Sequence, residues 1–180
     1  ILFNAKTIMT NKNHISGTDR CNEAVKSLNI DYDLIINVQA DEPLINPKQI
    51  DKIIDSFGVC PDDIISLAKK ITSKNEIHNP NTVKVNFNKE MIATDFYRDV
   101  EKESLTYYKH IGIYAFKKGI LQKLCALNPS ESELKLKLEQ LRWMDNNYKI
   151  KIIETNFESI SIDTKDDLDN LLEYYKKVGN

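Results

Sequence analysis

The chain has 180 residues, a net charge of −2 and a hydrophobic fraction of 41%. These values fit one soluble globular domain, residues 1–180, and provide no basic field for nucleic acid or a membrane surface. No apolar run approaches the ~18 residues that span a bilayer, and the N-terminus does not resemble a signal peptide. The cysteines at 21, 60 and 125 are widely spaced, which is typical of reduced thiols, so we expect a cytoplasmic protein.

The first elements are a possible strand end at 5–10, a helix at 19–28 and a strand at 34–38. Thr18 can cap the helix, because its hydroxyl can accept from a free backbone N–H. Gly17 permits a tight turn or the close approach of a ligand, and the N–H groups of a helix start can bind anions. A capped surface helix explains the same residues equally well.

The strand at 34–38 is apolar and largely β-branched, as in the centre of a parallel sheet, and a polar tail follows it. Asp41 and Glu42 in this tail would lie beyond the carboxyl end of the strand, where open α/β sheets bind their ligands. A carboxylate there can hold Mg²⁺ against substrate phosphates. The simpler alternative is that Asp-Glu-Pro only ends the strand.

A second helix is predicted at 47–57, since Asn46 can cap it, Pro47 suits its first position and Gln49 can complete a capping box. The strand at 64–68 then closes a strand–helix–strand unit whose crossover should be right-handed. Further strands are expected at 83–87, 91–97, 107–116 and 148–155, and helices at 117–126 and 131–146.

Two later stretches carry candidate functional residues. The strand at 107–116 places His110, Gly112 and Tyr114 on one face, although a buried, hydrogen-bonded core histidine is the simpler explanation for His110. Near the C-terminus a strand edge precedes a helix that Thr164 caps. The apolar stripe of this helix comprises Leu168, Leu171, Leu172 and Tyr175. Asp163 stands just before the cap, where a second capping role is the alternative to a functional one.

Six stretches together resemble one family, 3-deoxy-manno-octulosonate (Kdo) cytidylyltransferase, also called CMP-Kdo synthetase. They are Asn-His-Ile-Ser-Gly-Thr-Asp-Arg at 13–20, Val-Gln-Ala-Asp-Glu-Pro at 38–43, Asn-Pro-Asn-Thr-Val-Lys-Val at 79–85, His-Ile-Gly-Ile-Tyr at 110–114, Leu-Glu-Gln-Leu-Arg at 138–142 and Ile-Asp-Thr-Lys-Asp-Asp-Leu at 162–168. Each motif alone is weak, but six in the family's order over almost the whole chain form a specific match.

The resemblance implies an α/β fold with a doubly wound, mostly parallel sheet, the Rossmann-like nucleotidyltransferase fold. It implies transfer of CMP from CTP to Kdo with Mg²⁺, for lipopolysaccharide biosynthesis, in a homodimer. It implies that Asp41 and Asp163 are the catalytic carboxylates that hold the metal. It further implies that the Kdo pocket is lined by Gln39, His110, Tyr114, Glu139 and Gln140, and that Ser16, Gly17 and Thr18 lie near the nucleotide.

The chain departs from the family pattern in three places. Ile15 replaces a glutamine, and Ala40 replaces a glycine beside Asp41. The family's N-terminal basic, Gly-containing loop, which holds the triphosphate, has no counterpart here, so we expect a domain that lacks roughly 60 to 70 residues at its N-terminus. We therefore expect the isolated chain to form no CMP-Kdo at a useful rate and to aggregate readily.

Two alternatives remain open at this point. One is a cytidylyltransferase for another acidic sugar, such as an amino-Kdo or a sialic-type acid. The other is a non-catalytic remnant that contributes only a partner-binding surface. Binding of a nucleotide analogue would separate the enzyme from the remnant.

Overall fold

The structure is a computed structural model that describes residues 5–60, 62–100, 106–159, 161–162 and 164–178. Its strands are β1 (Leu34–Val38), β2 (Ile64–Lys70), β3 (Lys84–Phe87), β4 (Ala93–Tyr97), β5 (Tyr108–Lys117) and β6 (Ile150–Glu154). Its helices are α1 (Gly17–Leu28), α2 (Pro47–Phe57), α3 (Lys74–His78), α4 (Ile120–Cys125), α5 (Glu131–Leu136), α6 (Glu139–Asp145) and α7 (Lys165–Val178).

The strands form one sheet in the order β4-β3-β5-β2-β6, with β1 paired to β5. The α/β class is therefore confirmed, but the described strand pairs are not mostly parallel as predicted. Strand β5 runs antiparallel to β1, β2 and β3, and the pair β2–β6 is parallel. The reason is that β1 and β2, which share a direction as the two strands of a crossover unit should, both pair with β5, which runs against them.

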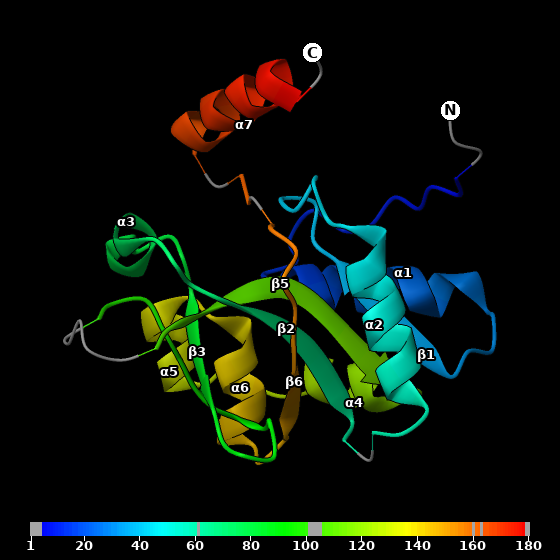
Figure 1. Cartoon of the computed structure of the whole chain (residues 1–180). Helices are drawn as coiled ribbons and strands as arrows, with labels where there is room; N and C mark the ends of the chain where they lie inside the picture. The colour runs from blue at the N-terminus through cyan, green and yellow to red at the C-terminus, as the bar shows by residue number, and fades with distance from the viewer. Residues whose placement is uncertain (1–4, 61, 101–105, 160, 163, 179–180) are drawn as a thin grey trace.

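Helices cover both faces of the sheet (Figure 1). On one face, Leu121 of α4 and Trp143 of α6 pack with Phe116 and Ile150 in the larger core cluster. On the other face, Ile53 of α2 packs with a second cluster that includes Ile65, Leu67, Ile111, Ile113 and Ala115. This three-layer arrangement holds the carboxyl ends of β1 and the bulged centre of β5 in fixed positions.

Local sequence signals account for most helix ends. The capping box of α2 is present as predicted, since Asn46 accepts from the backbone N–H of Lys48 and Gln49 accepts from that of Asn46, both at 3.0 Å. A second box opens α7, where the hydroxyl of Thr164 accepts from the N–H of Asp167 at 3.2 Å. In α1, however, the cap is Ser16 and not Thr18.

Three further predictions are wrong. The helix predicted over 131–146 is interrupted, because Lys137 adopts a left-handed conformation with φ 55° and ends α5, and α6 begins two residues later. Residues 5–10 form no strand, and Ile162 lies outside the strands of the sheet. The short helix α3 lies in a segment for which we predicted no helix.

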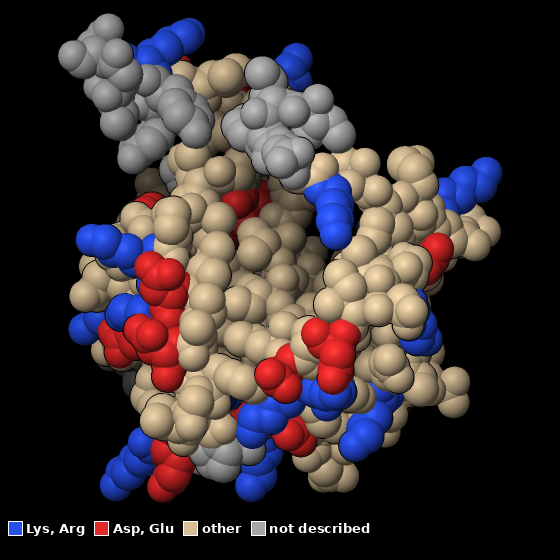
Figure 2. All heavy atoms as spheres, turned by 90° about the vertical axis from the view of Figure 1, so that its right-hand side faces the viewer, with Lys and Arg blue, Asp and Glu red and all other residues tan. Residues whose placement is uncertain are grey.

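Helix α7 stands apart from the sheet, on the side of the molecule where both chain ends lie (Figure 1). Of its predicted apolar stripe, Leu171 is buried whereas Leu168 and Leu172 are exposed. On the face seen in Figure 2, acidic and basic side chains gather around a mostly uncharged centre, and both signs are present, which agrees with the small net charge. Across the part of the chain that the structure describes, no helix has both the length and the apolar character needed to cross a membrane.

Candidate active site

Eight of the ten predicted site residues line one cavity of about 570 Å³, which we call the helix cavity because the starts of α1 and α6 form its walls. They are Ser16, Gly17, Gln39, Asp41, His110, Tyr114, Glu139 and Gln140. Thr18 is buried behind this wall, where its hydroxyl accepts from the side-chain amide of Asn37 at 3.4 Å. Asp163 lies outside the described residues, so its predicted role is not tested.

The start of α1 forms one wall of the helix cavity. Ser16 caps the helix, its hydroxyl accepting from the N–H of Asp19 at 3.0 Å. Gly17 leaves room for Gln39, because a Cβ atom at position 17 would lie 2.5 Å from Oε1 of Gln39 and would displace that side chain. The glycine of this motif therefore lets the Gln39 side chain lie across the first turn of the helix.

The break between α5 and α6 forms the opposite wall. It starts α6 at Glu139, whose carboxylate accepts from the side-chain amide of Gln39 at 3.2 Å. Burial raises the pKa of Glu139, and the neighbouring polar groups of Thr18 and Ser16 oppose that increase. Glu139 therefore joins the start of α1, the end of β1 and the start of α6, which are far apart in the sequence.

A buried ion pair fixes this wall from behind. The guanidinium of Arg142 donates to Glu133 through Nε at 2.7 Å and through a terminal nitrogen at 2.5 Å. The other terminal nitrogen of the guanidinium lies 3.8 Å from the carboxylate of Asp19, and this contact connects α6 with α1. Motif reasoning identified Arg142 only as part of a matching stretch, and neither partner was predicted to matter to the site.

Asp41 and Glu42 are neighbours in the sequence with different environments. Asp41 is exposed, and its side chain contributes to the helix cavity and to a second cavity beside it. Glu42 is buried and accepts from the hydroxyl of Ser159 and from the N–H of Gly112, the latter at 3.4 Å. Burial raises the pKa of Glu42. Asp41 is thus available to a ligand, whereas Glu42 holds the C-terminal segment against β5.

His110 and Tyr114 form the floor of the helix cavity, on β5. The two rings are 5.3 Å apart between centroids, and Tyr114 packs edge-on against Trp143 of α6 at 4.9 Å. His110 forms a 2.8 Å hydrogen bond through Nε2 with the hydroxyl of Ser66 on β2. Burial lowers the pKa of His110 to about 3, so the ring is neutral at physiological pH.

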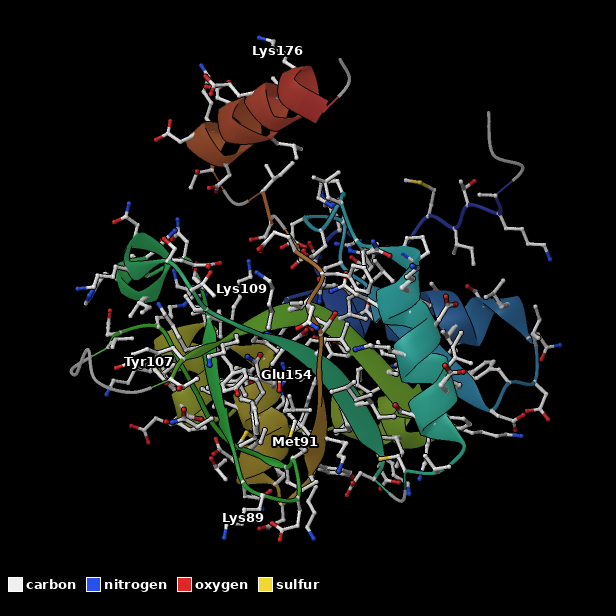
Figure 3. The ribbon with its side chains drawn as sticks, viewed as in Figure 1. Lys89, Met91, Tyr107, Lys109, Glu154 and Lys176 are labelled. Atoms are coloured by element: carbon white, nitrogen blue, oxygen red, sulfur yellow. The ribbon has the colours of Figure 1, made fainter. Side chains whose placement is uncertain are left out.

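The second cavity, about 620 Å³ in volume, lies along α3, the 79–83 loop and the C-terminal segment, and we call it the loop cavity. It shares Asp41, Val83, His110 and Gly112 with the helix cavity. Lys109 projects from β5 on this side (Figure 3), with its ammonium 2.8 Å from Glu76 and 2.6 Å from Glu158. The charge of Lys109 is therefore already balanced within the protein.

The 79–85 motif shapes the loop cavity through Lys84, whose side chain is fully buried. Its ammonium donates to the carbonyl of Asn79 at 2.7 Å and to that of Arg98 at 2.8 Å. Arg98 lines the cavity and donates to the carbonyls of Pro80 and Leu136. Sequence reasoning missed both Arg98 and Lys137, a basic residue on the rim of the helix cavity, because neither lies in a recognisable pattern of ligands.

Few of the described side chains around the two cavities could hold a metal ion. Within the described ranges, no three His, Cys, Asp or Glu side chains are grouped so that they could hold a metal ion. Magnesium that is bound together with phosphates needs only one or two protein carboxylates, because the phosphates and water complete its octahedron. The exposed carboxylate of Asp41 at the junction of the two cavities fits that requirement. In addition, the N–H of Ile162 donates to the carbonyl of Asp41 at 2.8 Å, which brings the C-terminal segment to this point.

The sheet, the helix start and the cavity define a nucleotidyltransferase fold. A solved structure titled CMP:2-keto-3-deoxy-manno-octonic acid synthetase complexed with CTP matches 98% of this chain and 74% of its own, with a TM-score of 0.86 and 31% identity. The family model described as cytidylyltransferase matches residues 2–152.

Relatives narrow the family further. The 3-deoxy-manno-octulosonate cytidylyltransferase of Bacteroides thetaiotaomicron is 39% identical, over 97% of this chain and 75% of the relative. That of Cytophaga hutchinsonii is 41% identical, over 92% of this chain and 71% of the relative. The chain therefore belongs to the cytidylyltransferase family, in its 3-deoxy-manno-octulosonate branch.

Proposed function

We propose that this protein transfers CMP from CTP to Kdo, releasing pyrophosphate. The observation that carries the proposal is the meeting of five separated motifs, at 13–20, 38–43, 79–85, 110–114 and 138–142, around one cavity. Packing of the protein core does not require polar side chains from these motifs to face one open cavity. A pocket that binds a hydroxyl-rich ligand does require it. The relatives and the solved structure carry names that agree with this reaction.

The start of α1 is proposed to lie against the nucleotide. Ser16 and Gly17 line the cavity at the first turn of a 12-residue helix, where backbone N–H groups without helical partners favour negatively charged ligands. Thr18 acts from behind the wall, because its hydroxyl and N–H interact with Glu139 and not with the cavity.

The acceptor is proposed to lie over β5 and α6. Gln39, His110, Tyr114, Glu139 and Gln140 supply both donors and acceptors to one side of the helix cavity, as an array of sugar hydroxyls requires. An acidic sugar also needs a cation for its carboxylate. Lys137 and Arg98 supply positive charge to the two cavities, whereas Lys109 is already paired with two glutamates.

In the reaction, an acceptor hydroxyl loses its proton and attacks the α-phosphorus, and the bond from that phosphorus to the departing pyrophosphate breaks. Asp41 is placed where both cavities meet, so its carboxylate would hold Mg²⁺ beside the reacting phosphate, and Asp163 is proposed as the second carboxylate. The metal would supply charge neutralisation on the phosphate oxygens. The chain's own groups orient the two substrates, which is the larger part of catalysis in phosphoryl-type transfer.

The test is product formation from CTP, Kdo and Mg²⁺, followed as pyrophosphate release and as the mass of the CMP-sugar. Because the relatives extend beyond the matched three quarters of their length, the assay uses this chain and a chimera that adds the rest of a relative. Kdo, its amino analogue and a sialic acid are compared as acceptors. We expect Kdo to be preferred. Equal rates with all three would contradict the acceptor, and no nucleotide binding by either protein would contradict the class.

The assembly and the location remain proposals. We propose a cytoplasmic homodimer, which the exposed Leu168 and Leu172 of α7 support because these side chains gain from being covered. Light scattering coupled to size-exclusion chromatography measures the mass directly. A monomer at all concentrations would contradict the dimer.

A further inference from the structure

The pairing of β2 with β5 contains an irregularity directly below the helix cavity. The register shifts between Ser66 and Leu67, so that Ser66 lies opposite Tyr114 while Leu67 lies opposite Ile111. Such a bulge leaves backbone groups of the longer strand without a partner in the ladder. Here the carbonyl of Ile113 accepts from the hydroxyl of Ser66 at 2.9 Å. The bulge thus directs the proton of Ser66 into the sheet.

The hydrogen bonds of Ser66 favour one tautomer of His110. A serine hydroxyl has one proton, and both carbonyls near it, those of Ile113 and Ile111 at 2.9 and 3.5 Å, can only accept. The same hydroxyl oxygen lies 2.8 Å from Nε2 of His110, so when the hydroxyl donates to the carbonyl of Ile113, Nε2 is the donor in that contact. A neutral imidazole has one N–H, and therefore Nδ1 is an acceptor.

The surroundings of His110 agree with this assignment. The ring packs edge-on against Phe96, at 5.1 Å between centroids, and beside Tyr114, and this exclusion from water disfavours an imidazolium. The residue lines both cavities. With Nε2 turned towards β2, Nδ1 is the polar atom that the ring can present to a ligand.

We propose that Ser66 is a positioning residue that holds His110 in its Nε2–H tautomer, so that Nδ1 accepts a hydrogen bond from a hydroxyl of the acceptor sugar. The proposal rests on the proposed function for the identity of the ligand, but the tautomer itself does not. Ser66, on β2, would thus act together with the motif at 110–114 on β5. The proposal also predicts selectivity, since a carboxylate or an O-methyl group at that position has no proton to donate.

The tautomer is measured directly by NMR of the full chain with ¹⁵N-labelled histidine. The chain has three histidines, and a His110→Gln variant identifies the signals of His110. We expect wild-type Nε2 to be protonated and Nδ1 not. Ser66→Ala should give a mixture of tautomers, and Ser66→Thr, which keeps the hydroxyl, should restore the wild-type state. If Ser66→Ala does not fold, the wild-type spectrum still decides, because a protonated Nδ1 there overturns the proposal.

Kinetics separates positioning from general damage. In Ser66→Ala we expect KM for the acceptor to rise about tenfold, the effect of one lost hydrogen bond, while KM for CTP changes less than about twofold. The matched control is Thr155→Val, which removes another buried hydroxyl on the side of β2 away from β5. Equal effects of the two variants on both KM values would overturn the proposal. Failure of the wild type to use any acidic sugar would instead contradict the proposed function and leave the NMR result standing.

Discussion

The helix cavity and the loop cavity lie side by side and share Asp41 and His110, but their charges are arranged differently. One group of charges along the loop cavity is paired, since Lys109 contacts both Glu76 and Glu158, and Lys69, which does not line the cavity, also contacts Glu158. In the helix cavity the ion pair of Glu133 and Arg142 is buried in the wall, and the remaining polar groups face the space. The comparison indicates that paired charges hold segments together along the loop cavity, whereas the helix cavity presents polar groups to its open space.

The largest effect is expected from breaking the buried pair. Glu133→Gln removes one charge and leaves the guanidinium of Arg142, with 4% side-chain exposure, without its closest counter-ion. Loss of one partner from a buried pair costs about 3–5 kcal/mol, because the other charge stays desolvated. We expect that loss in the free energy of unfolding, measured by urea denaturation. A change below about 1 kcal/mol would show that Asp19, at 3.8 Å, is a sufficient partner.

The next effect concerns the acid that the two cavities share. Asp41→Asn preserves size but removes the charge proposed to hold the metal, so we expect at least ~100-fold loss of turnover in the chimera, the scale of one strong electrostatic contact. Stability should not change, because the side chain is exposed. Asp51→Asn, at an exposed position on α2, is the matched control. Turnover near that of the control would mean that Asp41 is a turn residue only.

A smaller effect follows from filling the space at the start of α1. The Cβ of Gly17→Ala would approach Oε1 of Gln39 to 2.5 Å and push its side chain away from Glu139. We expect about a tenfold loss in kcat/KM for the acceptor, the cost of one displaced hydrogen-bonding group. The control is Gly58→Ala, since a Cβ there meets no atom within 4 Å. If both variants behave alike, the position of Gln39 does not matter.

These sites show what the sequence could predict and what it could not. The resemblance to the family implied the site residues, because its motifs are short local stretches that can be recognised in a sequence, and eight of the residues line one cavity. The sequence predicted Thr18 as the cap of α1, although Ser16 also carries a hydroxyl group that can accept from the backbone. Only the fold distinguishes them, since Asn37 and Glu139 engage Thr18 from other elements.

The break between α5 and α6 was missed for a similar reason. It has no glycine or asparagine, the residues that usually take the left-handed conformation after a helix, and Lys137 adopts that conformation instead. Contacts of the next residues offset the cost of this conformation, since Leu138 is buried and Glu139 accepts a hydrogen bond from Gln39. Likewise the bulge that joins Ser66 to His110 depends on the pairing of two strands, which periodicity within one strand does not specify.

The state of His110 also gives a pH dependence. Its pKa falls from an ordinary 6.5 to about 3 on burial, so below pH 6.5 the unfolded chain binds a proton that the folded chain does not. Stability present above pH 6.5 is therefore lost as the pH falls towards 3, by about 1.2 kcal/mol between pH 7 and pH 5.5. The raised pKa values of Glu42 and Glu139 make the free energy of unfolding change with pH in the opposite direction. Both proteins contain these residues, so their contribution cancels in the difference between wild type and His110→Gln. Parallel stability curves for the two proteins would refute the neutral buried ring.

The smallest effect should come from a glutamate at the loop cavity. The change is again Glu to Gln, so it can be compared directly with Glu133→Gln. Glu158→Gln removes a carboxylate whose side chain is 51% exposed and whose partners are Lys69 and Lys109. Exposed pairs contribute about 0.2–1 kcal/mol, since solvent screens them, and Lys109 keeps Glu76 at 2.8 Å. We expect a loss of unfolding free energy below about 1 kcal/mol and an unchanged KM for the acceptor. If Glu158→Gln instead cost as much as Glu133→Gln, or raised KM for Kdo tenfold, Glu158 and its lysine partners would act in ligand binding and not only in holding segments together.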